Sequence, residues 1–147
     1  MEFQNQLKEV YESYLKMKDA LVNDNFSLSV EKVAEVKSSL SKVDMKLLKD
    51  QQAHQNWMKF NKEIELALSN MKSVKEIKDI RHHFMALSDN LTYSVQMFGV
   101  NQKVYRQFCP MANNDKGAFW LSKEEHIQNP YFGDMMLRCG NVELIIE

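Results

Sequence analysis

Residues that interrupt regular structure are scarce in this chain and unevenly placed. The sequence of 147 residues contains two prolines, four glycines and two cysteines. Both prolines, both cysteines and three of the four glycines lie between Cys109 and Gly140. Proline and glycine disfavour the interior of helices, so their absence from residues 1–98 favours helices there. Irregular structure and special chemistry are therefore expected in the last third.

No charge of one sign dominates, and no hydrophobic run is long. The chain has 19 basic and 20 acidic residues and a formal net charge of −1, so a nucleic-acid partner is not expected. No apolar run approaches the roughly 20 residues that cross a bilayer, so membrane insertion is not expected either. The first residues lack the basic and apolar regions of a signal peptide.

Motifs of common enzymes are also missing. The sequence has no glycine-rich phosphate loop, no His-Glu-x-x-His and no Gly-x-Ser-x-Gly. The cysteines are not arranged as Cys-x-x-Cys, which argues against a thioredoxin-type redox role. Cys109 or Cys139 with His83 would imitate a thiol–imidazole pair, but no orienting group or oxyanion hole is evident. We expect a protein that is not an enzyme.

Residues 1–99 instead have the spacing of amphipathic helices. The first helix is expected to end at the turn-forming run 23–25, and its apolar stripe is Phe3, Leu7, Val10, Tyr14, Met17 and Leu21. The second begins at a serine cap, Ser27 or Ser29, and its stripe is Val33, Val36, Leu40, Val43 and Leu47. A break is expected within 49–56, because a helix from 29 to 71 is too long for a compact domain.

Two further helices follow this break. The third has the stripe Trp57, Phe60, Ile64, Ala67 and Met71. A capping box from Ser73 to Glu76 is predicted to open the fourth helix, which Gly99 ends because glycine accepts a positive φ. Helices of about 20 residues joined by short loops predict a mainly α fold, an up-and-down four-helix bundle.

The pattern changes after Gly99. Residues 104–109 and 141–146 are β-rich and are predicted to pair as a small β ribbon against the bundle. Turn signals between them predict an irregular segment, in which a second capping box at Ser122–Glu125 predicts one helical turn over 123–128. We expect a single domain, 1–147, with the bundle in 1–99 and a Cys- and Met-containing C-terminal motif in 100–147 packed on it.

Two pairs of soft ligands stand in the C-terminal motif, Cys109 with Met111 and Met136 with Cys139. Thiolate and thioether sulfur select Cu(I) or Ag(I) over hard cations. Residues two apart in an extended segment, or three apart in a helical turn, point to one side, so each pair can face the other. We predict a soft-metal-binding module that holds Cu(I) through both cysteines, helped by Met136 or Met111. His83 is a further candidate ligand, and its nitrogen makes Zn(II) a weaker alternative.

Two other interpretations of the cysteines stay open. A disulfide between them would close a loop of about 30 residues, worth about 3–4 kcal/mol in the chain-entropy model. The protein would then be a disulfide-stapled, non-enzymatic interaction domain that docks on another protein. Alternatively, both cysteines are buried thiols and the methionines fill the core.

The C-terminal motif also resembles a known family. The similarity is carried by Met136, by Arg81-His82-His83-Phe84, and by the runs Cys109-Pro110-Met111-Ala112, Gly117-Ala118-Phe119-Trp120-Leu121-Ser122, Ile127-Gln128-Asn129-Pro130-Tyr131-Phe132-Gly133-Asp134 and Cys139-Gly140. Together they resemble a domain family formally of unknown function. Its members occur as small exported proteins and at the C-terminal end of periplasmic adaptor subunits of copper/silver resistance–nodulation–division efflux pumps.

This resemblance implies a periplasmic domain connected with heavy-metal handling or efflux. The implied partner is a heavy-metal efflux adaptor or another envelope protein. The chain lacks the adaptor body, so a part in pump assembly does not follow from the resemblance.

Overall fold

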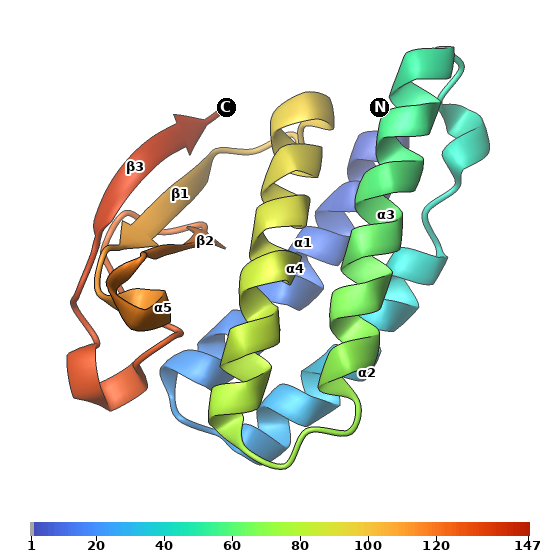
Figure 1. Ribbon diagram of the computed structural model, residues 1–147. Helices are drawn as coiled ribbons and strands as arrows, with labels where there is room; N and C mark the ends of the chain where they lie inside the picture. Colours follow the sequence, from blue (N-terminus) through green and yellow to red (C-terminus); the bar gives the residue numbers. More distant parts are fainter. Residues whose placement is uncertain (1) are drawn as a thin grey trace.

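The computed structural model in Figure 1 describes residues 2–147. Four long helices come first: α1 (Glu2–Val22), α2 (Phe26–Ser41), α3 (Gln51–Met71) and α4 (Ile77–Phe98). The strands β1 (Val104–Cys109), β2 (Ala118–Ser122) and β3 (Asn141–Ile146) follow, and the short elements are η1 (Met45–Leu47), α5 (Ala112–Asp115) and η2 (Gly133–Met136). The predicted mainly helical bundle with a small β element at its C-terminal end is confirmed.

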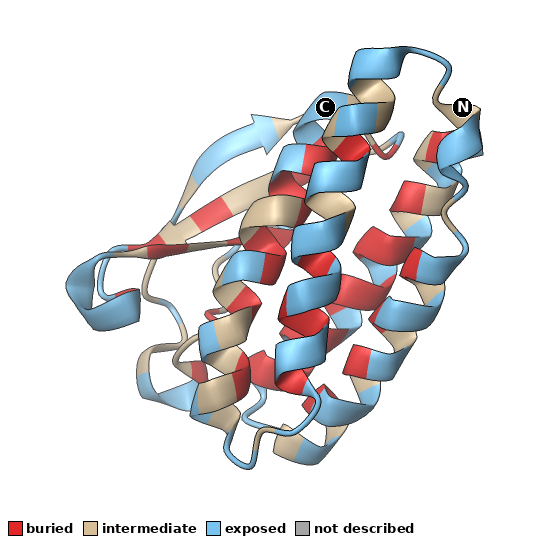
Figure 2. Cartoon of the chain, turned by 45° about the vertical axis from the view of Figure 1, so that its right-hand side comes forward, coloured by how far each residue is buried: buried red, intermediate tan, exposed pale blue. Residues whose placement is uncertain are grey.

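The bundle is built from two helical hairpins. α1 packs mainly on α2, and α3 packs mainly on α4. Figure 2 shows the buried positions as stripes facing the interior, with exposed positions outside. Leu7, Leu21, Ile64 and Phe84 are among the fully buried side chains of this core. Burial stabilises the fold by about 1.5–3 kcal/mol for each such side chain.

The start of α2 differs from the serine cap expected from the sequence. Asn25 is the capping residue, and its Oδ1 accepts the backbone N–H of Leu28 at 3.0 Å. Ser27 lies inside the helix, and the hydroxyl of Ser29 donates to the carbonyl of Asn25 at 2.7 Å. The asparagine is the better cap because it stands directly after the turn that ends α1.

The break between α2 and α3 comes earlier than predicted. α2 ends at Ser41, so Val43 and Leu47 lie outside it. Two aspartates account for the change: Asp44 Oδ1 caps η1, and Asp50 Oδ2 accepts the N–H of Ala53 at 3.0 Å as the cap of α3. Side chains that satisfy backbone donors in this way favour a helix start over continuation.

Neither predicted capping box forms. α4 begins only at Ile77, and its cap residue Glu76 makes no side-chain cap hydrogen bond. Residues 123–128 contain no helical turn, because Ser122 belongs to β2 and its Oγ accepts the N–H of Glu124 just beyond the strand. Gly99 does end α4, with φ of 78°.

The three strands form an antiparallel sheet in the order β2-β1-β3. The predicted ribbon corresponds to β1 and β3, and β2 is an additional strand. β2 packs against α4, whereas β3 lies at the edge away from the helices (Figure 1). Gly117 precedes β2 with φ of 89°, and a Cβ there would lie 2.3 Å from the ring of Phe108. Because β1 pairs with β3, the sheet brings the end of β1 next to the segment before β3.

Candidate thiol site and the adjacent groove

The two cysteines lie side by side. Cys109 is the last residue of β1, and Cys139 comes just before β3. Their Sγ atoms are 2.8 Å apart, although the residues are separated by 30 positions in the sequence. Cys109 is fully buried and Cys139 is partly exposed, so the pair is reached from the Cys139 side.

This separation is longer than a disulfide bond and shorter than an ordinary van der Waals contact between two sulfur atoms. Both cysteines are free thiols, and a disulfide bond would be about 2.05 Å long. Two sulfurs bound to one metal at about 2.3 Å lie roughly 3.8 Å apart at a tetrahedral angle, and roughly 4.6 Å apart in a linear arrangement. An ion can enter between Cys109 and Cys139 only after the sulfurs move apart by about 1–2 Å.

The environment of the pair favours the protonated thiol. The hydrogen bond with Cys109, together with burial, raises the pKa of Cys139. A backbone hydrogen bond from Met111 acts in the opposite direction and lowers this pKa. Since only the thiolate binds a metal well, metal binding at this pair must release protons and must weaken in acid.

Asn129 holds Cys139 in position. Its side-chain amide donates to the carbonyl of Cys139 at 2.9 Å, and its backbone N–H donates to the carbonyl of Leu137 at 2.8 Å. Its Oδ1 accepts the backbone N–H groups of Tyr131 and Phe132 at 2.8 and 3.2 Å. Asn129 is fully buried, so each of these bonds would be costly to lose.

Gly140 permits the close approach of Cys139 to β1. Its φ is 136°, and a Cβ at this position would lie 2.7 Å from the carbonyl oxygen of Phe108 and 3.1 Å from the ring of Trp120. Any other residue at 140 would force the segment away from the sheet. The resemblance run Cys139-Gly140 therefore has a structural reason in the packing.

A second anchor joins the C-terminal segment to the helices. Arg81 on α4 donates to the carbonyl of Pro130 at 2.7 Å and to Asp24 Oδ1 at 2.6 Å. The other oxygen of Asp24 accepts the backbone N–H of Asp134 at 3.0 Å. The hydrogen bond with Arg81 lowers the pKa of Asp24, which therefore stays ionised at neutral pH. Gly133 leaves room for this contact, because a Cβ added at this position would collide with the Asp24 carboxylate.

Tyr131 completes the attachment by filling the space between the helices and the sheet. Its ring packs edge-on against Phe84 of α4 and Trp120 of β2. Its hydroxyl donates to the carbonyl of Phe119 at 2.6 Å. The segment that carries Cys139 is thus fixed to α4 and to β2 together.

The candidate methionines separate into two environments. Met136 lies in η2, is partly buried, and its carbonyl accepts the N–H of Cys139 at 3.0 Å. Met111 is 48% exposed and lines an open groove between α4 and the loop after β1, together with Met85, Met135 and His82. The sequence pattern predicted Met111 as a ligand beside Cys109. Met111 also lines the groove, and its role as a ligand beside Cys109 stays a prediction.

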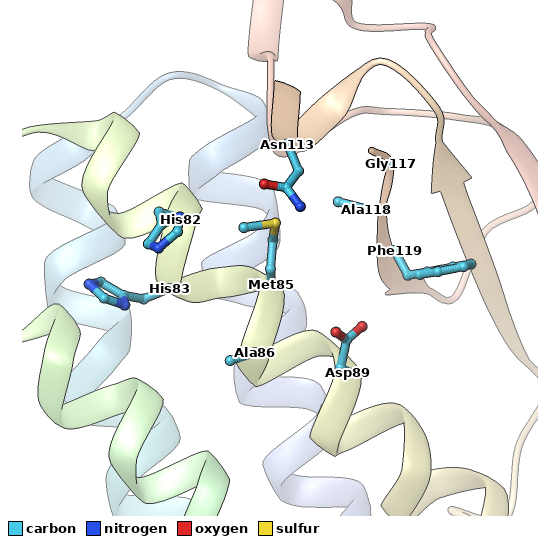
Figure 3. Close-up of a pocket in the computed structure, with 9 residues that line it drawn as sticks. All are labelled: His82, His83, Met85, Ala86, Asp89, Asn113, Gly117, Ala118 and Phe119. Atoms are coloured by element: carbon cyan, nitrogen blue, oxygen red, sulfur yellow. The ribbon is translucent and has the colours of Figure 1, made fainter. Parts of the chain in front are cut away.

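The adjacent histidines line a smaller cavity beside this groove. Figure 3 shows His82, His83, Met85, Asp89 and Asn113 around a space of about 410 Å³. Their imidazole centroids are 5.2 Å apart. His82 lines both the cavity and the groove. His83 lines the cavity, and among the described residues it does not line the groove that contains Met111. The role of His83 as a ligand stays a prediction.

Asp89 contributes a carboxylate to the smaller cavity. It extends from α4 toward β2 (Figure 3), and burial raises its pKa. The charge of Arg106, whose guanidinium stacks 3.7 Å from the ring centroid of Phe119, counteracts this rise.

Sequence reasoning missed His82 and Met85 as neighbours of Met111. A signal was present, because His82 and Met85 are three apart and share one face of a helix. Within residues 2–147, no three His, Cys, Asp or Glu side chains gather closely enough to hold a metal ion. In the same range, no helix is both long and apolar enough to cross a membrane.

The helical part of the chain identifies the family to which the protein belongs. The sequence model of a family described as "Protein of unknown function (DUF3347)" matches residues 10–103. The chain belongs to this family. The match spans most of α1 through α4 and ends before β1, so both cysteines, Met111 and Met136 lie outside it. No curated protein and no solved structure matched the chain.

Membership in the DUF3347 family agrees with the expected family of unknown function at this coarser level. The C-terminal signature and the connection with efflux adaptors remain implications of the resemblance.

Proposed function

We propose that this DUF3347 protein is a soft-metal-binding module that holds one monovalent ion, Cu(I) or Ag(I), between the sulfurs of Cys109 and Cys139. The observation that carries the proposal is the 2.8 Å approach of the two Sγ atoms from positions 30 residues apart. Thiolate pairs favour such ions, which accept low coordination numbers, over hard cations.

The surroundings of the pair support this function in two ways. Asn129 and Gly140 hold the backbone of Cys139 against the end of β1, so the chain is ordered before binding and only the two sulfurs have to move apart. Cys139 is partly exposed whereas Cys109 is buried, so an ion has one side from which to enter. Met136, which precedes Cys139 by one turn, is the proposed third sulfur donor.

Binding would replace the thiol–thiol hydrogen bond by two metal–sulfur bonds. The thiol protons leave to solvent, the sulfurs separate, and the ion keeps its charge of +1. The raised pKa of Cys139 opposes this step in acid, so affinity should rise with pH until both thiols are deprotonated.

The proposed setting is the periplasm, and the proposed partner is a heavy-metal efflux adaptor or another envelope protein. Both come from the resemblance of the C-terminal motif. Zn(II) is the weaker candidate ion, because a zinc site needs further nitrogen or sulfur ligands around the two thiolates.

A second candidate function rests on the same short sulfur separation. The two thiols are placed to form a disulfide, giving a stapled interaction domain. In that reaction both thiols pass two electrons and two protons to a disulfide oxidant, which is reduced to a dithiol. The staple would then fix the C-terminal segment and would need no metal.

Titration with Cu(I) under anaerobic conditions, in competition with a chromophoric Cu(I) chelator, tests the proposal. We expect roughly one tightly bound Cu(I) per chain, which is lost in Cys109→Ser and in Cys139→Ser. Met58→Leu, which changes an exposed methionine on α3, is the control and should bind normally. Unchanged Cu(I) binding in either cysteine variant would remove the proposed site.

Counting thiols in unfolded protein after aerobic purification separates the two functions. Two free thiols per chain disfavour the staple. No free thiols, a melting temperature lowered by reductant, and no response to Cu(I) would replace the metal-binding function by the second candidate.

A further inference from the structure

Three methionines and a histidine line one open groove outside the thiol pair. Met85 and His82 belong to α4, Met111 follows β1, and Met135 lies in η2. The groove has a volume of about 760 Å³. Neither cysteine is among the described residues that line it, so these sulfurs form a separate group.

Two of these methionines are too exposed to be core residues. Met111 is 48% exposed and Met135 is 80% exposed. A methionine that fills the core is buried, as Met17 and Met71 are in the bundle. The thioethers at 111 and 135 are therefore accessible to a solute in the groove, and packing alone does not account for them.

The α4 side of the groove is a helical face. His82 and Met85 are three residues apart, so their side chains leave the helix on the same side. In Figure 3, Met85 extends toward Asn113, and its methyl end turns to the side on which His82 lies. A thioether and an imidazole from α4 thereby stand opposite the loop that carries Met111.

Two contacts position the side of the groove opposite α4. Asp134, the residue before Met135, is held by Asp24 through its backbone N–H. Met111 comes two residues after Cys109, the last residue of β1, and its carbonyl accepts the N–H of Asp115 at 3.4 Å, so the start of the loop is tied to the sheet. The methionines of the groove are therefore attached to the bundle and not on a free tail.

The charges near the groove do not repel a monovalent cation. Asp79 and Asp115 line it, together with Lys78 and Arg81. The guanidinium of Arg81 is already paired with Asp24. The remaining charges, those of Asp79, Asp115 and Lys78, are close to balanced. The softness of the donor atoms therefore determines which cation binds.

We propose that Met85, Met111 and Met135, with His82, form a second binding site for a soft monovalent cation such as Ag(I) or Cu(I). Thioether sulfur is a neutral soft donor that selects these ions and binds no hard cation well. The site has no thiolate, so it should bind more weakly than the cysteine pair.

This site goes beyond the thiol function because it requires neither cysteine. Its place beside them also gives it a role in loading. An ion captured in the groove would contact Met111, which follows Cys109 of the thiol pair by two residues. Transfer would exchange thioether for thiolate ligands, with release of thiol protons and no change in the charge of the ion.

Silver titration of protein labelled with methyl-¹³C-methionine tests the groove site. The Cys109→Ser, Cys139→Ser double variant is titrated with silver nitrate in chloride-free buffer, and methionine methyl resonances are followed. We expect the resonances of Met85, Met111 and Met135 to shift together and saturate at the first equivalent. Met58 and Met97, which are 50% and 49% exposed, are matched controls and should not move at that point.

Equal shifts at all exposed methionines, or no shift at the three groove methionines, would overturn the proposal. If the double variant does not fold by circular dichroism, wild-type protein preloaded with one equivalent of Ag(I) is titrated instead. The second equivalent is then expected to shift the three groove resonances. If these resonances do not shift, the proposal is overturned.

Leucine variants separate this proposal from the thiol function. Leucine conserves the volume of methionine but removes the sulfur. Met85→Leu, Met111→Leu and Met135→Leu combined should weaken Ag(I) binding in the groove by about tenfold or more. The triple variant should still bind one Cu(I) at the thiols, whereas the control pair Met58→Leu and Met97→Leu should leave both sites intact. Unchanged groove binding in the triple variant would contradict the assignment.

Discussion

The bundle and the C-terminal segment are stabilised in different ways. In α1–α4, many apolar side chains share one core, which also includes Val104, Trp120 and Leu121 of the sheet. Residues 123–140 contribute no fully buried member to this core, and a few specific contacts fix their backbone: the hydrogen bonds of Asn129, the ion pair of Arg81, and the close approach at Gly140. A shared core tolerates substitutions of similar volume, whereas a segment fixed by few contacts does not. The thiol pair depends on this second kind of structure.

The largest effect is expected for Asn129→Ala. The substitution leaves backbone groups at Tyr131, Phe132 and Cys139 without partners, each costing about 1–3 kcal/mol when buried. Because these three residues are partly exposed, we expect a total loss in the lower part of the summed range, about 3–5 kcal/mol. Hydrogen exchange should show that amides of residues 129–139 lose protection while those of α3 keep it. An equal loss of protection in both regions would remove the distinction between them.

Gly140→Ala should have the next largest effect. The added Cβ meets the Phe108 carbonyl, so a destabilisation of about 2–3 kcal/mol and a displacement of Cys139 from Cys109 are expected. The rate at which a mild oxidant forms the disulfide measures this displacement directly. Met17→Leu in the bundle core is the control: it should cost less than about 1.5 kcal/mol and should not change this rate. Disulfide formation at the wild-type rate in Gly140→Ala contradicts the account of position 140.

Asp24→Asn should weaken the anchor between the helices and the segment more modestly. Asp24 is 38% exposed at its side chain, so the loss at pH 7 should be about 1 kcal/mol after allowance for solvent screening. Asparagine tolerates the positive φ of 56° at this position, so the backbone is not strained.

The pH dependence of this contribution has a definite sign. The pKa of Asp24 is lowered in the folded state, so its stabilising contribution is present above the pKa of the unfolded chain, about 3.9, and is lost as the pH falls below it. Chemical unfolding of both proteins at pH 7 and pH 3 measures the difference. A difference that grows in acid would contradict the assigned role of Asp24.

The smallest effect is expected for Asp89→Asn, and it should be stabilising. Burial raises the pKa of Asp89, so the native state favours the protonated carboxyl, and this residue reduces stability as the pH rises through its folded pKa. Replacing it by the neutral amide should raise the melting temperature by about 1–3 °C at pH 7 and by less at pH 4. A lower melting temperature at pH 7 would show that Asp89 makes a favourable ionic contact.

The bundle could be predicted because its signal is local and repeated. Each helix shows its buried stripe in the sequence, from Phe3 to Leu21 in α1, and Gly99 marks the end of α4. The helix starts were less predictable, because several side chains compete to cap each one. Asn25 caps α2, where a serine cap was predicted, and Asp50 caps α3, for which no cap was predicted.

The C-terminal segment could be predicted only in part. The β1 and β3 runs are β-rich in the sequence and alternate only weakly. β2 is short and lies between turn signals, and its pairing with β1 comes from long-range contacts. The soft ligands were visible as two pairs. Their final grouping depends on Tyr131 and Arg81 docking the segment on α4, which no local pattern encodes. This docking also brings Met111 to the same groove as Met85 and His82, a grouping that the sequence did not indicate.

The coordination of copper in the loaded protein is the most direct test of the central claim that Cys109 and Cys139 act together. X-ray absorption at the copper edge, on protein reconstituted with one equivalent of Cu(I) without oxygen, reports the atoms bound to the ion. The account predicts a first shell dominated by sulfur, with short thiolate bonds that disappear in the Cys109→Ser, Cys139→Ser double variant. A shell of nitrogen and oxygen, or a sulfur shell unchanged in that variant, would contradict it.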